Sequence, residues 1–240
     1  MTGNGESMKK IAALLFALVA VGSLSAFEFK ADFSKGKWDP ADFVMVKGPR
    51  WTKVGSWIQE SDHIVQNVPA SATEQDLHRR MHDEAYVAMC YGKKIQMDKQ
   101  VVCSSIMSFD YRMAPLIVIA PVLGTHKPSG APEFREHWEI VLYDLGINVW
   151  KHMWKNEKPA WVKHSYLLSP YKPLTRYELK ITISATNKGQ MLEVECEGRK
   201  FGCYLPGLGK EFYLGIIGCE GRNRFYDFKI SAPKGKVMEK

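Results

Sequence analysis

Short apolar runs alternate with clusters of turn-forming residues over most of the chain. The runs are rich in Val, Ile, Tyr, Phe and Trp, which favour strands, and Gly, Pro, Asn and Asp separate them. In residues 177–183 every second position is apolar, which is typical of a strand that buries one face. The pattern predicts an all-β fold, a two-sheet antiparallel β-sandwich of the jelly-roll type.

The positions of the runs predict the individual elements. Strands are expected at residues 27–33, 57–58, 64–67, 86–90, 103–113, 116–122, 137–143, 148–154, 176–185, 191–197, 200–204, 213–218 and 224–230. One short helix is expected within residues 72–85, where Thr73 stands before acidic residues as an N-cap would. Residues 125–135 contain two prolines and a glycine, and they predict a long surface loop.

The N-terminus has the pattern of an export signal. Lys9 and Lys10 precede an unbroken apolar stretch at residues 11–22, and small residues follow it up to Ala26. A membrane-spanning helix would need about 20 apolar residues, which this stretch lacks. We therefore expect residues 1–26 to be a signal peptide with a short upstream extension, and the mature protein to be secreted or periplasmic.

The rest of the chain suits one domain. We expect a single β-sandwich at residues 27–231 and a basic C-terminal tail at residues 232–240. The longest later apolar run, residues 114–124, contains two prolines, so no membrane span is expected there. The formal net charge of +7 favours anionic partners. Nucleic acid is not expected, because the basic residues are scattered and no recognition motif is present, whereas an anionic glycan suits an exported protein.

Five cysteines occur in the chain, so at least one thiol of an exported protein stays unpaired. They are Cys90, Cys103, Cys196, Cys203 and Cys219. No CxxC pair is present, so the sequence predicts no metal site. Cys196 and Cys203 flank an expected hairpin turn, where a disulfide and two free thiols are both open interpretations.

Residues 137–154 carry the most distinctive pattern, that of a β-hairpin. A two-residue turn at Leu145 and Gly146 would set Glu139 opposite His152. One face would then carry His137, Glu139, Val141, Tyr143, Asn148, Trp150, His152 and Trp154. The other face is apolar and suits a core, and a one-residue slip in the pairing would exchange the two faces.

Large aromatic rings beside His, Glu and Asn are what a sugar-binding surface requires. The C–H faces of a sugar stack on Trp and Tyr, and its hydroxyls need fixed hydrogen-bonding groups. We expect Asn148, Trp150 and Trp154, with Arg135 beside them, to bind a polysaccharide or oligosaccharide. A solvated outer face, or one covered by a loop, is the alternative.

A carboxylate next to an imidazole also suits acid/base chemistry. Glu139 and His152, with His137 and Tyr143, form the candidate catalytic group of a polysaccharide lyase or glycoside hydrolase. A nearby arginine such as Arg135 would neutralise the uronate of a lyase substrate. The alternative is a pair that only orients the aromatic residues.

A second candidate binding segment follows Glu220 in a loop. Arg222, Asn223 and Arg224 are candidate ligands of a uronate or sulfate group, and Arg222 is a second candidate for neutralising a uronate. Pairing of the arginines with Glu220 and Asp227 is the equal alternative.

Two acidic sets have weaker interpretations. Glu193, Glu195 and Glu197 share one face, and a glycosidase needs two carboxylates beside the bond that it cleaves, but these residues run into a turn and suit a charged outer face better. No cofactor is expected. A structural calcium ion at Asp32 and Asp227 is left open, although no ligand spacing supports it.

The order of several segments resembles a known superfamily. The chain carries FEF at 27–29, ELKITI at 178–183, LEVECEGRK at 192–200, LGIIG at 214–218 and FYDFKI at 225–230. This order is similar to that of the concanavalin A-like lectin/glucanase jelly roll, above all to secreted bacterial families associated with polysaccharide degradation. The resemblance covers nearly the whole mature chain and implies a glycan context, but it implies no particular reaction.

The combined expectation is a secreted carbohydrate-binding or carbohydrate-active jelly-roll protein whose concave sheet recognises a polysaccharide, with an anionic one favoured. The alternatives are a polysaccharide lyase or glycoside hydrolase that uses the same face, and a non-catalytic envelope protein whose aromatic face meets another protein.

Export can be tested on the full chain produced in a bacterial host. We expect the protein recovered from the periplasm or medium to begin at Phe27, or at Ala26 if cleavage follows Ser25, because small residues precede both positions. N-terminal sequencing and intact mass measure this directly. Recovery of the uncleaved chain from the cytoplasm alone would contradict the prediction.

Overall fold

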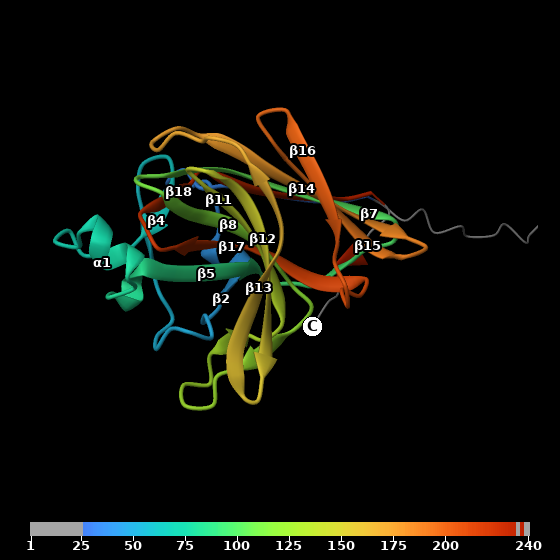
Figure 1. Cartoon of the computed structure of the whole chain (residues 1–240), viewed down its shortest axis with the longest axis horizontal. Coiled ribbons are helices and arrows are strands. Elements are labelled where there is room, and N and C mark those ends of the chain that lie inside the picture. Colours follow the sequence, from blue (N-terminus) through green and yellow to red (C-terminus); the bar gives the residue numbers. More distant parts are fainter. Residues whose placement is uncertain (1–25, 234–235, 238–240) are drawn as a thin grey trace, which may run out of the picture.

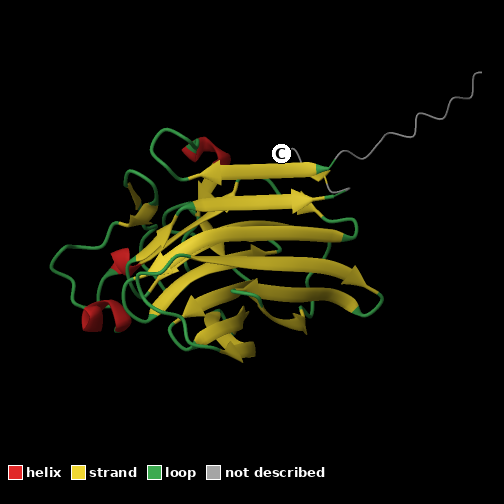
Figure 2. Ribbon diagram, turned by 90° about the horizontal axis from the view of Figure 1, so that it is seen from above, coloured by secondary structure: helices red, strands yellow, loops and turns green. Residues whose placement is uncertain are grey.

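The computed structural model describes residues 26–233 and 236–237, which form two antiparallel sheets packed face to face (Figure 1). Figure 2 shows long, curved strands running side by side across the molecule. The expected all-β sandwich is therefore confirmed. The predicted signal peptide lies outside the described residues except for Ala26, and so do five residues of the predicted tail.

The first sheet, sheet A, contains most of the C-terminal strands. Its order is β16 (Arg199–Tyr204), β15 (Gly189–Cys196), β14 (Tyr177–Thr186), β7 (Gln100–Phe109), β18 (Asn223–Phe225), β4 (Ile64–Gln66) and β3 (Trp57–Gln59). In addition, β19 (Asp227–Ala232) pairs with β7 and with β1 (Phe27–Asp32).

The second sheet, sheet B, contains the distinctive hairpin. Its order is β13 (Lys158–Leu168), β12 (Gly146–Lys155), β11 (His137–Tyr143), β8 (Met113–Ala120), β17 (Glu211–Cys219), β5 (Tyr86–Tyr91) and β2 (Phe43–Met45). A short strand, β6 (Ile95–Gln96), pairs with β17 and with β20 (Lys236–Val237), which falls within the predicted tail.

The remaining elements are short. β9 (Leu123–Thr125) and β10 (Pro132–Phe134) form a hairpin that overlaps the predicted surface loop and begins two residues before it. The helix α1 (Glu74–His78) lies inside the predicted range and starts at a capping box, in which Thr73 and Asp76 each accept a backbone hydrogen bond from the other. Two 3₁₀ turns, η1 (Pro40–Asp42) and η2 (Asp83–Ala85), complete the set among the described residues.

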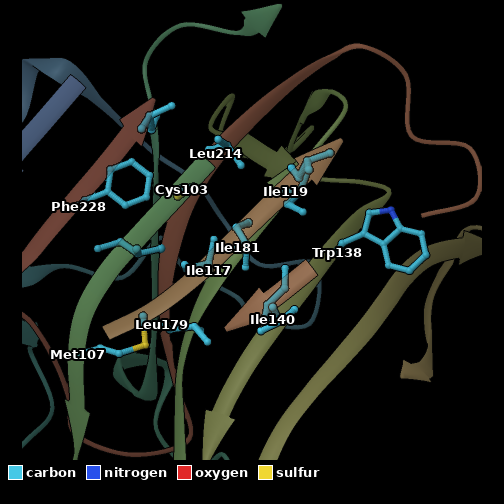
Figure 3. Packing of buried hydrophobic residues seen from close by; sticks show 14 of the residues in the cluster. Cys103, Met107, Ile117, Ile119, Trp138, Ile140, Leu179, Ile181, Leu214 and Phe228 are labelled. Carbon is cyan, nitrogen blue, oxygen red and sulfur yellow. The ribbon is translucent and has the colours of Figure 1, made fainter. Parts of the chain in front are cut away.

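The main core lies between the two sheets, because the strands turn their apolar positions toward each other. Figure 3 shows side chains from both sheets interleaved. Sheet A contributes Met107, Leu179 and Ile181, and sheet B contributes Ile117, Ile140 and Leu214. Each of these side chains is completely buried, which stabilises the fold by about 1.5–3 kcal/mol per side chain.

A second apolar cluster covers the outer face of sheet B. Two connecting segments, residues 46–55 and 68–85, lie against it, and we call them the covering segments. They place Trp51 and Leu77 on outward side chains of β5, β8 and β17. The approach is close, since a Cβ built on Gly55 would stand 2.2 Å from the carbonyl oxygen of Tyr86. The central strands of sheet B are therefore buried on both faces.

Two predicted strand assignments are wrong in detail, and one long strand was missed. The run 103–113 is not one strand, because the chain leaves sheet A after Phe109 and enters sheet B at Met113. The run 224–230 is broken at Tyr226, where pairing with β4 gives way to pairing with β1. The strand β13 was not predicted, although Asn156 and Glu157 form a tight turn with positive φ between β12 and β13.

The cysteines are free thiols. All five lie in the described part of the chain, and no disulfide joins any of them, so Cys196 and Cys203 do not bridge their hairpin. Burial raises the pKa of both thiols to about 11, which makes them unreactive near neutral pH. Within the described ranges, no helix is long and apolar enough to cross a membrane.

The role of the inner face of β11 can be tested with one truncation. Ile140→Ala should lower the free energy of unfolding by about 2–5 kcal/mol, because it leaves a cavity between the sheets. Chemical denaturation measures the loss, and Val162→Ala on exposed β13 is the matched control, with an expected change within about 0.5 kcal/mol. Equal losses for the two variants would place Ile140 outside the core.

Candidate functional site

The hairpin of β11 and β12 turns at Asp144 and Leu145, one residue earlier than predicted. Tyr143 therefore faces Gly146, Glu139 faces Trp150, and the predicted pairing of Glu139 with His152 is wrong. The error moves each residue's partner by two positions along β12. Since side chains alternate with a period of two, the predicted set of outward residues keeps its face.

Gly146 explains why the turn sits where it does. Its φ is +153°, and a Cβ at this position would stand 2.0 Å from the carbonyl oxygen of Leu167 on β13. Only glycine lets β12 start so close to β13. The turn is thereby shifted to Asp144, whose amide donates to the carbonyl of Arg112 at 2.8 Å, and to the exposed Leu145.

Four aromatic rings form a stack across the outer face of sheet B, and we call it the ring stack. Phe134 of β10 lies 4.8 Å from His137, His137 lies 4.5 Å from His152, and His152 lies 6.2 Å from Trp161, measured between ring centroids. Neighbouring planes differ by 28° or less. His137, His152 and Trp161 are direct cross-strand neighbours on β11, β12 and β13, which aligns their rings.

The carboxylate of Glu139 bridges the two histidines of this stack. Its Oε1 lies 3.2 Å from Nε2 of His137, and its Oε2 lies 3.0 Å from Nε2 of His152. The contact between Glu139 and His152 expected from the sequence is thus present, although along a diagonal of the ladder. The side chains of all three residues are less than one tenth exposed.

Burial and nearby charges shift the pKa values of Glu139 and His137 in opposite directions. Burial raises the pKa of Glu139, but attraction to His152 and hydrogen bonds with both imidazoles outweigh it and hold the pKa well below its usual range. Burial lowers the pKa of His137, and the contact with Glu139 offsets only part of this. Glu139 is therefore an anion with both of its oxygens engaged.

A pocket opens beside this group, and we call it the outer pocket. Its volume is about 230 Å³. From the hairpin, it is lined by Glu139, Tyr143, Asn148, Trp150 and His152, all of which belong to the predicted face. Its floor also includes Leu116 and Val141, so it combines apolar surface with polar groups from adjacent strands.

Three other predicted residues of the hairpin region lie outside this lining. His137 is 1% exposed and stands behind Glu139 and His152. The outward face of the hairpin was expected to be accessible to a ligand, and this expectation is wrong for His137. The guanidinium of Arg135 lies 4.3 Å from the ring centre of Trp154 and 3.3 Å from a carboxylate oxygen of Glu133. Arg135 and Trp154 thus pack on each other.

The second predicted segment is not part of the outer pocket. Asn223 is fully buried, and its side-chain amide donates to the carbonyl of Cys219 at 3.2 Å. Arg222 donates to the carbonyl of Pro69 at 3.0 Å, and Arg224 forms an ion pair with Asp110. Arg222 and Arg224 thus contact a covering segment and sheet A, so the alternative in which they pair with Glu220 and Asp227 is wrong.

The two acidic sets also have partners within the protein. Asp32 and Asp227 are cross-strand neighbours, but the carboxylate of Asp227 accepts from the amide of Ile106 at 2.7 Å and lies 2.6 Å from Lys229. Glu193 and Glu195 both lie within 3.4 Å of Lys200 on the outer face of sheet A.

Four charged or aromatic residues of the outer pocket were not predicted. Arg50 and Arg80 come from the covering segments, Glu220 comes from the turn after β17, and Trp161 comes from β13. Arg50 lies 4.8 Å above the ring of Trp161, and Arg80 forms an ion pair with Glu220. Trp161, Val162 and Tyr166 favour a strand after the Asn156–Glu157 turn, and this signal could have predicted β13.

Comparison with known proteins gives the fold. No protein-family model matches the chain, and no curated protein matches it significantly. Among solved structures, it is similar to lectin UEA-II complexed with galactose, with 11% identity and a TM-score of 0.53 over 86% of this chain and 98% of that one. The chain has the concanavalin A-like lectin fold.

Two further solved structures share this lectin fold. The carbohydrate recognition domain of Emp47p is 8% identical over 87% of this chain and 95% of that one, with a TM-score of 0.53. The GlcNAcα1-4Gal-releasing endo-β-galactosidase from Clostridium perfringens is 9% identical over 87% of this chain and 63% of that one, with a TM-score of 0.54. At such low identity the likeness establishes the fold alone.

The dependence of the site on its turn can be tested at Gly146. Gly146→Ala should lower the free energy of unfolding by roughly 1–3 kcal/mol, because its methyl group meets the backbone of β13. Gly209→Ala is the control, since a Cβ there would touch nothing closer than 4.0 Å. Equal stability of the Gly146→Ala variant and the wild-type protein would show that β13 does not lie against the turn.

Proposed function

We propose that this protein binds a carbohydrate in the outer pocket of sheet B. The observation that carries the proposal is the joint presence of two tryptophans, an asparagine, a tyrosine and two arginines around one cavity of about 230 Å³. That combination offers both the flat apolar surfaces and the fixed polar groups that a sugar ring requires.

The tryptophans supply the stacking surfaces. Trp161 is 47% exposed on the edge strand β13, and Trp150 is half-buried on the neighbouring strand. Each ring has a cation–π contact. Arg50 lies 4.8 Å from the ring centre of Trp161, and Lys163 lies 5.8 Å from that of Trp150. An exposed tryptophan costs solubility, and one that lines a pocket is typical of a ligand site.

The polar groups supply orientation. The side-chain oxygen of Asn148 is buried in the pocket wall, and within the described part of the chain it has no hydrogen-bond partner. An unpaired buried oxygen costs about 1–3 kcal/mol, which a hydroxyl donor on a ligand would recover. Tyr143 lines the same wall and can both donate and accept.

One arginine of the pocket suits an acidic sugar. Arg50 and Arg80 line the pocket beside Glu139 and Glu220, and the whole chain carries a net charge of +7. Arg80 is paired with Glu220, which leaves Arg50 as the group best suited to a uronate. An exported protein would meet such polysaccharides outside the cytoplasm, as the N-terminal sequence suggests.

The structural neighbours agree with a sugar ligand. One is a lectin complexed with galactose, another is a carbohydrate recognition domain, and a third is an endo-β-galactosidase. They support a carbohydrate as the ligand class. The particular glycan is chosen by the residues of the outer pocket, which differ from protein to protein on one fold.

Cleavage of the bound glycan is the second candidate function. It is favoured by the 3.0 Å contact between Glu139 and His152, which lies in the wall of the same pocket as Tyr143. A lyase would use such groups to move the proton beside a uronate carboxyl. The binding screen below therefore also records new reducing ends and the absorbance of unsaturated uronates.

Binding can be tested on a panel of neutral and uronate-containing polysaccharides. We expect the mature protein to be retained by at least one, and Trp150→Ala and Trp161→Ala each to weaken this retention about tenfold or more. Affinity electrophoresis measures the retention. Tyr204→Ala is the control, since this aromatic is 44% exposed on sheet A and should not affect binding.

Three results would count against the proposal. One is retention by none of the polysaccharides, and another is normal retention of both tryptophan variants. The third is a loss with Tyr204→Ala as large as with Trp161→Ala, which would move the binding surface to sheet A.

A further inference from the structure

Three metal-ligand side chains converge on the outer face of sheet B. His137, Glu139 and His152 each offer one ligand atom, and these atoms all lie within 4.8 Å of one another. Among the described residues, this is the one group of at least three His, Cys, Asp or Glu side chains arranged in this way. The group is buried, whereas most clusters of charged side chains on a protein surface are solvated.

The backbone partner of His137 fixes a proton on Nδ1 of its ring. Its Nδ1 lies 3.1 Å from the carbonyl oxygen of Arg135, which can only accept, so Nδ1 carries a proton. Its Nε2 lies 3.2 Å from Oε1 of Glu139, which also only accepts when ionised. Two acceptors cannot share a 3.2 Å contact, so a proton on Nε2 or a cation must lie between Nε2 and the carboxylate oxygen, and a metal ion can take this position.

This arrangement is the one found around metal-bound histidines. A histidine ligand commonly donates its other ring N–H to a backbone carbonyl, which orients the ring and makes the free nitrogen a better ligand. The ring stack adds rigidity, because Phe134 and His152 lie on the two faces of His137 at 4.8 Å and 4.5 Å. Both histidines are thus held with Nε2 toward Glu139.

We infer that His137, Glu139 and His152 form a binding site for a divalent transition-metal ion, with Zn²⁺ as the best match. Two imidazole nitrogens and one carboxylate favour Zn²⁺ and its neighbours in the first transition row over Ca²⁺ and Mg²⁺, which prefer oxygen ligands. Ligand atoms of a tetrahedral Zn²⁺ site stand about 3.3 Å apart. Oε1 of Glu139 lies 3.2 Å from Nε2 of His137 and Oε2 lies 3.0 Å from Nε2 of His152, so each pair has about this separation. One ligand atom from each of the three residues lies within 4.8 Å of the other two.

The surroundings leave one side of the site open. Glu139 and His152 line the outer pocket, and His137 closes the site from behind. Three protein ligands with a fourth position open to a pocket is the arrangement of a Zn²⁺ site that also binds water or a ligand. The cysteine spacing predicted no metal site. The ligands inferred here are instead two histidines and a glutamate on neighbouring strands. The metal site does not require that a glycan binds.

The test uses tag-free protein treated with a chelator and then titrated with Zn²⁺ alone, by calorimetry and by elemental analysis after dialysis. We expect one Zn²⁺ per chain. The near-isosteric variants Glu139→Gln and His152→Asn should each weaken binding at least about a hundredfold, since even the loss of a group that only supports a ligand costs 10–100-fold. Ca²⁺ at millimolar concentration should not compete.

Two controls separate this site from other histidines. His126→Ala and His164→Ala should bind Zn²⁺ like the wild-type protein, because neither belongs to the three-residue group. Anomalous scattering at the zinc edge from wild-type crystals should give a peak between His137, Glu139 and His152, and this holds even if a variant fails to fold. Less than about 0.2 Zn²⁺ per chain, a peak elsewhere, or unchanged binding by both site variants would overturn the inference.

The outcome is separable from that of the proposed function. Zn²⁺ binding is measured without any glycan, and glycan retention is measured with the chelator-treated protein as well as with the Zn²⁺-loaded one. Retention without Zn²⁺ binding would overturn the metal site alone, and Zn²⁺ binding without retention by any polysaccharide would overturn the proposed function alone.

Discussion

The structure depends on the burial of sheet B on both faces. One face packs against sheet A, and the other is covered by the segments 46–55 and 68–85 over β5, β8 and β17. A buried sheet can hold a charged or polar group only where partners satisfy it, since an unpaired polar group in such a place costs several kcal/mol. The buried ion pair of Lys47 and Glu133, 3.0 Å apart, meets this requirement at one margin of the covered area, and Glu139 with its two histidines meets it beside the outer pocket.

The outer pocket forms where the covering segments 46–55 and 68–85 end on the outer face of sheet B. The apolar side chains of the covering segments pack on β5, β8 and β17, whereas Arg50 reaches across to Trp161 on β13, and a recess remains between them. Its two sides differ in origin, because Arg50 and Arg80 come from the cover and the aromatic and polar residues come from the strands. The same boundary brings the buried triad of His137, Glu139 and His152 within reach of any ligand in the pocket, which links the proposed carbohydrate site to the inferred metal site.

Residue alternation predicted the parts of the fold in which one strand face is polar. It gave β14, the bounds of β11 and the outward set of the hairpin, and this set survived a wrong turn because the error was two residues in register. Residue alternation failed to predict the parts of the structure that are determined by contacts between distant segments. The segments that cover sheet B have no periodic pattern in the sequence, so the position of Arg50 and Arg80 in the outer pocket could not be predicted. The cysteine spacings that predicted no metal site say nothing about histidines that meet across strands, and the stack of His137 on His152 required the true register.

The central claim is that ligands bind on the outer face of sheet B rather than on sheet A or the loop around Arg222. A crystal structure of the mature protein with the oligosaccharide that it retains best tests this most directly. The account predicts a sugar ring stacked on Trp150 or Trp161, with a hydroxyl within hydrogen-bond distance of Asn148. Sugar density against Arg222 and Arg224, or on the outer face of sheet A, with the outer pocket filled by solvent alone, would contradict it.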